Sequence, residues 1–146
     1  MHERSTPAAL EGIRVITTGQ ILAAPYCSTL LGEFGAEVIK VEQPGIGDPN
    51  RDNLSFSQDN RGVKSVTIDL HHAEGQALFR RLCDTADILV ENFRPGTLES
   101  WGIGPDALRE SNPGLVCVRI SGYGQTGPYR DRAGFDRVAL AFAGIT

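Results

Sequence analysis

One apolar segment of this sequence ends in three side chains that could bind a ligand carrying both a heterocycle and phosphates. Residues 88–90 read Ile-Leu-Val, and Asn92, Phe93 and Arg94 follow before a Pro-Gly pair ends the segment. The apolar run is typical of a strand buried on both faces. In an open parallel sheet, ligands bind at the carboxyl ends of such strands. The alternative is an ordinary turn with a packed phenylalanine and a solvated arginine.

A second segment with possible chemistry, residues 38–51, reads VIKVEQPGIGDPNR. A strand is expected to end near Lys40 and Glu42, and a glycine-containing loop with Asp48 and Arg51 follows it. Glycines let backbone amides approach a ligand closely, and Lys40 and Arg51 could meet phosphates, the arginine in a bidentate manner. The alternative is that Lys40 and Glu42 simply pair at the edge of the sheet.

Weaker signals come from isolated charged residues. Lys64 stands in a basic turn before a predicted strand, and His71 and His72 stand at the start of a predicted helix. With no cysteine or carboxylate at ligand spacing, we interpret the two histidines as solvated. Asp136 could be a site acid, but we favour a first-turn helix residue stabilised by the helix dipole.

A literal G-x-G-x-x-G pattern at Gly122, Gly124 and Gly127 follows a predicted strand. The dinucleotide-binding fingerprint belongs in the first βαβ unit and opens a helix. Here Pro128 follows the last glycine and no helix opens within the pattern. We therefore interpret residues 121–134 as a loop near a site rather than as a nicotinamide-cofactor motif.

The remaining pattern alternates strands with helices. The sequence predicts strands at 13–17, 36–41, 65–70, 86–91 and 115–120, and helices at 26–34, 73–85, 96–100, 105–111 and from 135 onward. In the helix at 73–85, Leu78 and Leu82 lie one turn apart and indicate the apolar side. Such alternation predicts an α/β fold, with a Rossmann-like, mostly parallel sheet and flanking helices. Residues 1–10 are expected to be flexible.

Composition indicates a globular chain. The 146 residues are 40% hydrophobic and 22% charged, with a formal net charge of −4, which argues against nucleic-acid or anionic-membrane partners. No apolar run approaches the length of a membrane-spanning helix, and the first residues lack the apolar core of a signal peptide. Cys27, Cys83 and Cys117 are odd in number and scattered among apolar neighbours. We interpret them as buried thiols of a cytoplasmic protein.

The segments together are more specific than any one of them. The succession LAAPYCSTLLGEFGAEVIKVEQPGIGDPNR, NRGVKSVTIDL, ADILVENFRPG and SGYGQTGPYRDRAGFD closely resembles the N-terminal part of class III coenzyme A transferases. This is the CaiB/BaiF family, which includes formyl-CoA, carnitine and bile-acid CoA-transferases and α-methylacyl-CoA racemases. The resemblance covers residues 10–146. It implies that acyl-CoA and a carboxylic acid are the substrates, with no metal.

The resemblance also implies a larger architecture. Family members are considerably longer, with a large Rossmann-like domain, a smaller second domain and an interlocked dimer. We therefore expect residues 11–146 to be the N-terminal part of the large, coenzyme A-binding domain, with the rest of the fold beyond the chain. A homodimer is expected for the full-length form.

The resemblance implies site residues wherever a motif position of the family matches a residue of this sequence. In the family, coenzyme A lies over the carboxyl edge of this sheet. The motif positions that bind it fall on Asn92, Phe93, Lys64, Gln43 and Arg132, and Leu22 and Ala23 match the loop that faces the thioester. Two departures weaken individual contacts. Gln43 stands where members often carry arginine, and Ser100 stands at another basic position.

Catalysis in transferase members depends on an aspartate that attacks the thioester, and its position lies beyond Thr146. We therefore expect no catalytic residue in this chain and no activity from the 146 residues alone. Racemase members carry a histidine within the motif that reads Gly-Phe-Asp here. Phe135 cannot carry a proton, which disfavours that activity. The alternatives left open are a racemase-type acyl-CoA enzyme and an inactive coenzyme A-binding or structural fragment.

Overall fold

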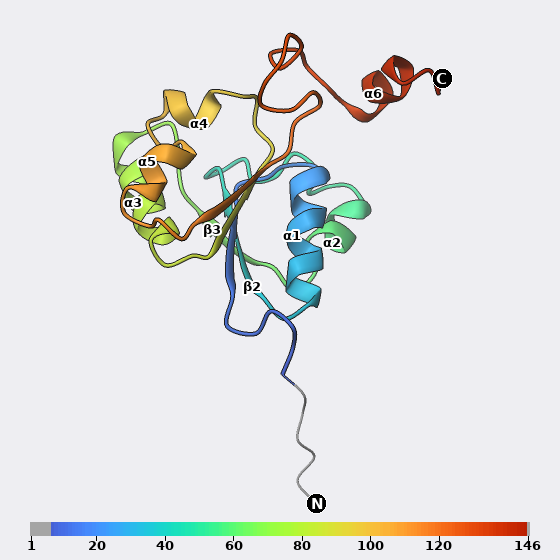
Figure 1. Cartoon of the computed structure of the whole chain (residues 1–146). Coiled ribbons are helices and arrows are strands. Elements are labelled where there is room, and N and C mark those ends of the chain that lie inside the picture. Colours follow the sequence, from blue (N-terminus) through green and yellow to red (C-terminus); the bar gives the residue numbers. More distant parts are fainter. Residues whose placement is uncertain (1–6, 146) are drawn as a thin grey trace, which may run out of the picture.

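A five-stranded parallel sheet forms the centre of the computed structural model, which describes residues 7–145 (Figure 1). The strands are β1 (Arg14–Thr17), β2 (Glu37–Glu42), β3 (Lys64–Thr67), β4 (Ile88–Glu91) and β5 (Val116–Arg119). Their order in the sheet is β3-β2-β1-β4-β5, and all four pairings are parallel. The predicted Rossmann-like α/β class is therefore confirmed.

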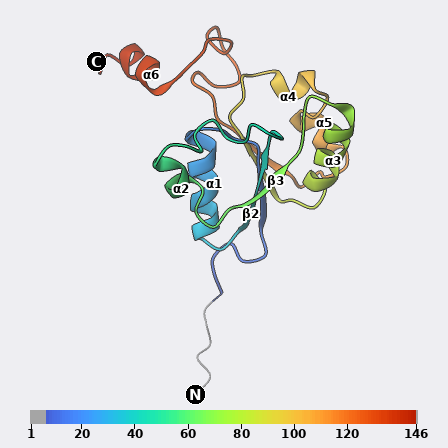
Figure 2. The same ribbon diagram turned by 180° about the vertical axis from the view of Figure 1, so that it is seen from behind.

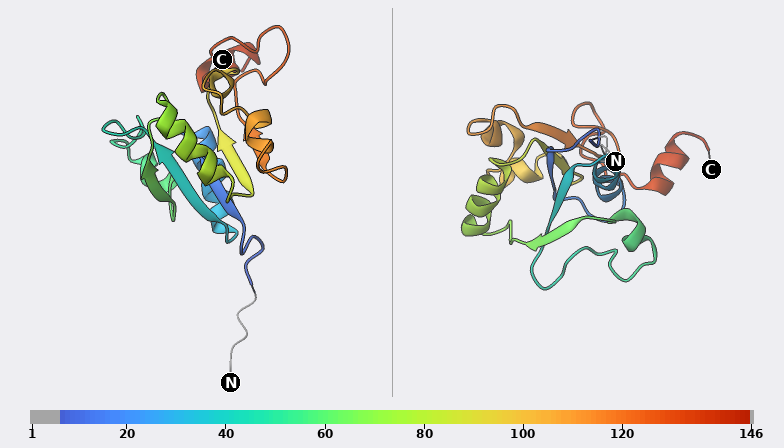
Figure 3. Two further views of the ribbon diagram at one scale, coloured as in Figure 1. Left: turned by 90° about the vertical axis from the view of Figure 1, so that its left-hand side faces the viewer. Right: turned by 90° about the horizontal axis from the view of Figure 1, so that it is seen from below.

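Helices cover both faces of the sheet. On one face lie α1 (Ala23–Glu33) and α2 (Ser55–Asp59), and on the other lie α3 (Ala73–Cys83), α4 (Thr97–Ser100) and α5 (Pro105–Arg109) (Figures 1 and 2). The last helix, α6 (Asp136–Phe142), stands apart from these layers and buries none of its residues (Figure 3). The sequence-based prediction lacked α2, because a short polar segment has no apolar periodicity to reveal it.

Successive residues of a strand point to opposite faces of the sheet, so they pack into two separate hydrophobic cores. Val15, Val38 and Val90 pack with Ala24 on the α1 side. Ile16 and Leu89 belong to the larger core on the other side, with Phe79 at its centre and fully buried. This two-sided burial is why the strands read as continuous apolar runs.

The apolar side of α3 differs from the one expected. Phe79 and Cys83 form the buried seam, whereas Leu78 is 47% exposed. Phe79 and Cys83 are four residues apart and share a helix face, and the partly buried Leu82 packs against the same core, so the prediction was right for Leu82 and wrong for Leu78.

The chain start and the edge strand also differ in detail from expectation. Of the predicted flexible start, residues 1–6 lie outside the described residues, and the Leu10 N–H donates to the Phe34 carbonyl at 2.8 Å. β3 ends at Thr67, three residues earlier than predicted, and its four residues are exposed at the edge of the sheet. Within residues 7–145, no helix is long and apolar enough to cross a membrane.

The cysteines are not equally buried, which corrects the sequence-based interpretation. Cys83 is buried, while Cys27 and Cys117 are only partly buried. Burial raises the pKa of the Cys83 thiol to about 12. At pH 8 the Cys83 thiol therefore stays protonated, and the thiolate is the reactive form.

We expect iodoacetamide at pH 8 to leave Cys83 unmodified in the native protein and to modify it in denaturant, with Cys27 reacting before it. Peptide mass spectrometry over a time course measures each site. Equal native rates at Cys83 and Cys27 would contradict the packing of α3 against the sheet.

Candidate functional site

A groove lies at the carboxyl edge of the sheet, where the chain changes direction. The chain passes from β1 outward through β2 to β3, and then returns to the other side of β1 to place β4 and β5. The loops after β1 and β4 therefore diverge, which is the switch point at which open α/β sheets bind ligands. The groove, about 820 Å³, is lined by residues 20–23, 92–94 and 134–137. Its size suits a cofactor-sized ligand.

Four of the seven predicted binding residues meet in this groove. Leu22 and Ala23 contribute from the start of α1, and Asn92 and Phe93 contribute from the turn after β4. Leu22 is 53% exposed, so its side chain is available to a ligand. Sequence positions about 70 residues apart are thus brought together at the carboxyl edge of the sheet.

Asn92 is the residue that links the two walls. Its Oδ1 accepts a hydrogen bond from the Gln20 N–H at 2.9 Å, and its Nδ2 donates to the Gln20 carbonyl at 2.8 Å. The amide thus pairs with the backbone of one residue in the manner of a neighbouring strand. Its place in the groove is as predicted, but its polar ends bind the opposite wall.

Ile21, which follows Gln20, is bound by the loop after β2. Among residues 7–145 it is the one non-glycine with a left-handed backbone, at φ 67°, a conformation that costs about 1–3 kcal/mol. Its N–H donates to both carboxylate oxygens of Asp48, at 3.2 and 3.3 Å, and its carbonyl accepts from Asn50 Nδ2 at 3.4 Å. The loop after β2 therefore holds the strained turn after β1.

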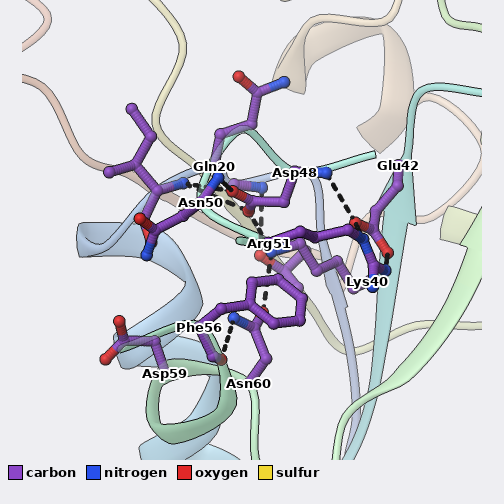
Figure 4. Close-up of polar contacts among 12 residues, drawn as sticks. Gln20, Lys40, Glu42, Asp48, Asn50, Arg51, Phe56, Asp59 and Asn60 are labelled. Carbon is purple, nitrogen blue, oxygen red and sulfur yellow. Dashed lines mark hydrogen bonds and ion pairs between the residues drawn. The ribbon is translucent and has the colours of Figure 1, made fainter. Parts of the chain in front are cut away.

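Asp48 belongs to a buried ion pair (Figure 4). Lys40 Nζ lies 2.5 Å from Asp48 Oδ2, and the two side chains are 2% and 0% exposed. Lys40 also donates to Asn60 Oδ1 at 2.8 Å and lies over the ring of Phe56. The idea that Lys40 meets a phosphate is therefore wrong, and so is the alternative, because its partner is Asp48 rather than Glu42.

Glu42 is satisfied by other groups. Its carboxylate accepts from Arg51 and Ser65 and from the Asp48 N–H at 2.9 Å. Burial acts to raise the pKa of Glu42, but the hydrogen bonds from Arg51 and Ser65 and the charge of Arg51 outweigh it, so that pKa lies below its usual range. Arg51 is 46% exposed and pairs with Glu42, which opposes the expected phosphate contact.

Glu91 holds the turn after β4. Its side chain is 1% exposed and accepts from the Phe93 N–H at 2.7 Å and from Arg119 Nε at 2.6 Å. Burial raises the pKa of Glu91 despite these two donors. The position of Phe93 is therefore set by a buried carboxylate.

A second, smaller cleft adjoins the groove. Gln43 lies there together with His71 and Trp101, and Phe93 and Gln20 line both hollows. Phe93 and His71 each meet Trp101 edge-on, with ring centroids 5.5 and 4.9 Å apart. The expectation of exposed histidines is confirmed, since the side chains of His71 and His72 are 55% and 78% exposed. No local pattern in the sequence indicated that His71 reaches this cleft.

Two predicted residues lie outside the groove. Arg132 lines a neighbouring cleft that includes Asn92 and Phe93, and its guanidinium stacks on Tyr129 at 4.3 Å. Lys64 begins β3 at the opposite, amino end of the sheet, where it pairs with Glu37 at 2.7 Å. The structure therefore does not bring Lys64 to the other predicted residues.

Two close backbone approaches explain glycines near the site. A Cβ at Gly19 would lie 2.1 Å from the Cβ of Ala24, so the turn after β1 requires glycine there. A Cβ at Gly122 would lie 2.5 Å from the Cα of Gly134, where the two ends of the late loop meet. No helix opens within the glycine pattern, and the next one is α6, whose first residue is Asp136. Both observations fit the loop interpretation.

Comparison with known proteins places this chain in a family. The model of CoA-transferase family III matches residues 10–146. The beta subunit of succinyl-CoA–L-malate CoA-transferase from Chloroflexus aurantiacus is 51% identical over 99% of this chain and 38% of its own length. Succinate–glutarate CoA-transferase from Agrobacterium fabrum is 42% identical over 99% of this chain and 40% of its own length. The chain thus spans about two fifths of these relatives.

Solved structures agree. Rv3272 from Mycobacterium tuberculosis superposes with a TM-score of 0.91 at 47% identity, covering 95% of this chain and 39% of that one. A CAIB/BAIF family protein from Brucella suis gives a TM-score of 0.91 at 37% identity, covering 96% of this chain and 40% of that one. A short chain dehydrogenase/reductase family protein, 18% identical at a TM-score of 0.55, shares the fold alone. The chain belongs to CoA-transferase family III, the CaiB/BaiF family.

Proposed function

We propose that this chain is the N-terminal portion of an acyl-CoA:carboxylate CoA-transferase and that it supplies the coenzyme A-binding edge. The observation that carries the proposal is the groove at the switch point. It gathers Leu22, Ala23, Asn92 and Phe93, four of the positions that the family resemblance assigns to coenzyme A.

The chemistry of the groove supports this ligand. Leu22 and Phe93 offer apolar surface to a pantetheine chain, and Arg94 and Arg137 line the same groove. Guanidinium groups match phosphate oxygens in a bidentate geometry. The groove can therefore hold a long ligand with an apolar arm and an anionic end.

The other predicted contacts have unequal support. Gln43 shares Phe93 and Gln20 with the groove through the adjoining cleft, and Arg132 lies in a cleft next to it. Both stay predictions for coenzyme A binding. Lys64 has the least support, because its ammonium pairs with Glu37 at the far end of the sheet.

The transfer step in this proposal uses a carboxylate from the remainder of the protein. An aspartate oxygen attacks the thioester carbonyl carbon, the C–S bond breaks, and coenzyme A leaves as the thiolate. The acyl group stays on the enzyme as a mixed anhydride. The 146 residues contribute binding and no nucleophile, so their expected activity alone is nil.

Two alternatives remain. A racemase-type enzyme needs acid/base groups beside the thioester. The groove wall offers Phe135, which is 67% exposed and carries no proton. An inactive coenzyme A-binding or structural fragment would bind the ligand without turning it over, and turnover by the full-length protein separates it from the transferase.

The assembly and location are part of the proposal. We infer a cytoplasmic enzyme that forms an interlocked homodimer in its full-length form. Succinyl-CoA–L-malate CoA-transferase is named with alpha and beta subunits, so a mixed dimer is the competing arrangement. Native mass spectrometry of the full-length protein alone and with a paralogous subunit distinguishes the two.

We expect the full-length protein to transfer coenzyme A from succinyl-CoA to at least one acid in a panel of small mono- and dicarboxylates, as measured by chromatography of the CoA esters. The 146-residue chain should show no turnover, because it lacks the attacking carboxylate. Deuterium uptake into 2-methylacyl-CoA without transfer would instead support the racemase, and robust turnover by the short chain would refute the missing-nucleophile argument.

We also expect the full-length Asn92→Ala/Phe93→Ala variant to bind coenzyme A more weakly than the unsubstituted protein. Phe93→Ala alone should weaken binding about tenfold, because the ring supplies apolar area to the groove. Isothermal titration calorimetry measures the dissociation constants.

The matched control is Phe34→Ala. This side chain is 58% exposed and follows the carboxyl end of α1, whereas the groove lies at the start of that helix. The control should bind coenzyme A as the unsubstituted protein does. Unchanged affinity in the Phe93→Ala variant would count against coenzyme A in this groove.

A further inference from the structure

We propose that Asp48 is a positioning residue of the transferase. Its buried carboxylate fixes the turn of residues 20–22, and this turn aims the start of α1 at the thioester end of the groove. The inference rests on the proposed function for its catalytic consequence. Its structural part concerns a side chain that is 0% exposed and cannot itself touch a ligand.

Ile21 is hydrogen-bonded through its backbone by Asp48 and Asn50. Asp48 accepts the Ile21 N–H with both oxygens, and Asn50 donates to the Ile21 carbonyl. The Asn50 N–H donates back to Asp48 Oδ1 at 2.8 Å, which fixes the two holding residues relative to each other. The amide and the carbonyl of Ile21 are therefore both bound by one short segment.

Gln20 is hydrogen-bonded through its backbone in the same way. Asn92 binds both the N–H and the carbonyl of that residue from the turn after β4. Two consecutive residues are thus bound through both of their backbone polar groups, one from each side of β1. This double hold keeps Ile21 at φ 67°, a region that a β-branched side chain avoids.

Asp48 is itself held in place by neighbouring residues. Lys40 Nζ lies 2.5 Å away and is oriented by Asn60 Oδ1 and by the ring of Phe56. Glu42 contributes from the same strand as Lys40, since its Oε1 accepts the Asp48 N–H. Figure 4 shows Lys40, Glu42 and Asn60 together with Asp48 in this network of polar contacts.

The bound turn leads directly into α1. Leu22 precedes the first residue of α1, and its side chain makes no capping hydrogen bond. The direction in which the chain enters α1 is therefore set by the bound turn before it and by the packing of the buried Ala24. If Ile21 relaxed to a negative φ, Leu22 and Ala23 would turn away from Phe93 and the groove would lose one wall.

A pair of variants of the full-length protein tests the role. Lys40→Met/Asp48→Asn and Lys40→Met/Asp48→Leu both remove the ion pair, and asparagine and leucine have nearly the same shape. The variants differ in whether position 48 can accept the N–H groups of Ile21 and Asn50, the two residues that Asp48 holds together. We expect the leucine variant to lose kcat by about a hundredfold relative to the asparagine variant, because the thioester is then misplaced. KM for acyl-CoA should rise by a smaller factor, because Phe93, Arg94 and Arg137 still line the groove.

Asp52→Asn is the matched control, because Asp52 is an exposed carboxylate in the same loop. It should keep both kinetic constants. Equal kcat in the leucine and asparagine variants, with both folded by circular dichroism, would overturn the proposal.

Hydrogen exchange of the unsubstituted protein tests the hold independently of activity and of variant folding. The amides of Gln20 and Ile21 should be protected at the level of neighbouring strand amides. Exchange of the Ile21 amide as fast as in exposed loops would overturn the role of Asp48 even in an active enzyme, because Asp48 accepts that amide, whereas Asn92 accepts the Gln20 amide. Protected amides in a protein without CoA transfer would instead show that the proposed function had failed while the hold was real.

Discussion

The buried pair of Lys40 and Asp48 is the interaction on which the loops at the carboxyl edge of the sheet depend. Removing two ions from water costs several kcal/mol for each, and a buried pair is tolerated only when additional hydrogen bonds satisfy it. Here Asp48 also accepts backbone N–H groups of Ile21 and Asn50, and Lys40 also donates to Asn60. Since the bonds from the Ile21 N–H to Asp48 join the loops after β1 and β2, part of the cost of burial is offset by contacts that shape the site rather than the core.

Two other buried carboxylates bind loop amides along the carboxyl edge of the sheet. Glu42 at the end of β2 accepts the Asp48 N–H, and Glu91 at the end of β4 accepts the Phe93 N–H. A carboxylate buried at the end of a strand thus binds an amide in the loop that follows it. Loops held this way have little conformational freedom left to lose when a ligand binds, which favours affinity through pre-organisation.

The elements could be predicted from the sequence because their signals are local. Apolar runs, Pro25 near the start of α1 and Gly35 after its end lie within the segments they define. The position of the groove also followed, since parallel strands bring their carboxyl ends to one edge. The partners of Lys40 and Asn92 did not follow, because Asn92 meets Gln20 across 72 residues. No local pattern distinguishes an inward lysine from a solvated one.

The charge of the site shows why such partners matter for function. The chain carries a net charge of −4, which by itself would disfavour an anionic ligand. Three of its carboxylates near the edge are buried and paired with cations: Asp48 with Lys40, Glu42 with Arg51 and Glu91 with Arg119. Charges compensated at contact distance contribute little beyond a Debye length of about 8 Å. The groove wall then presents two guanidinium groups and one carboxylate, from Arg94, Arg137 and Asp136. An acidic chain can therefore offer phosphates a locally positive surface, because its negative charges are used internally to hold the loops.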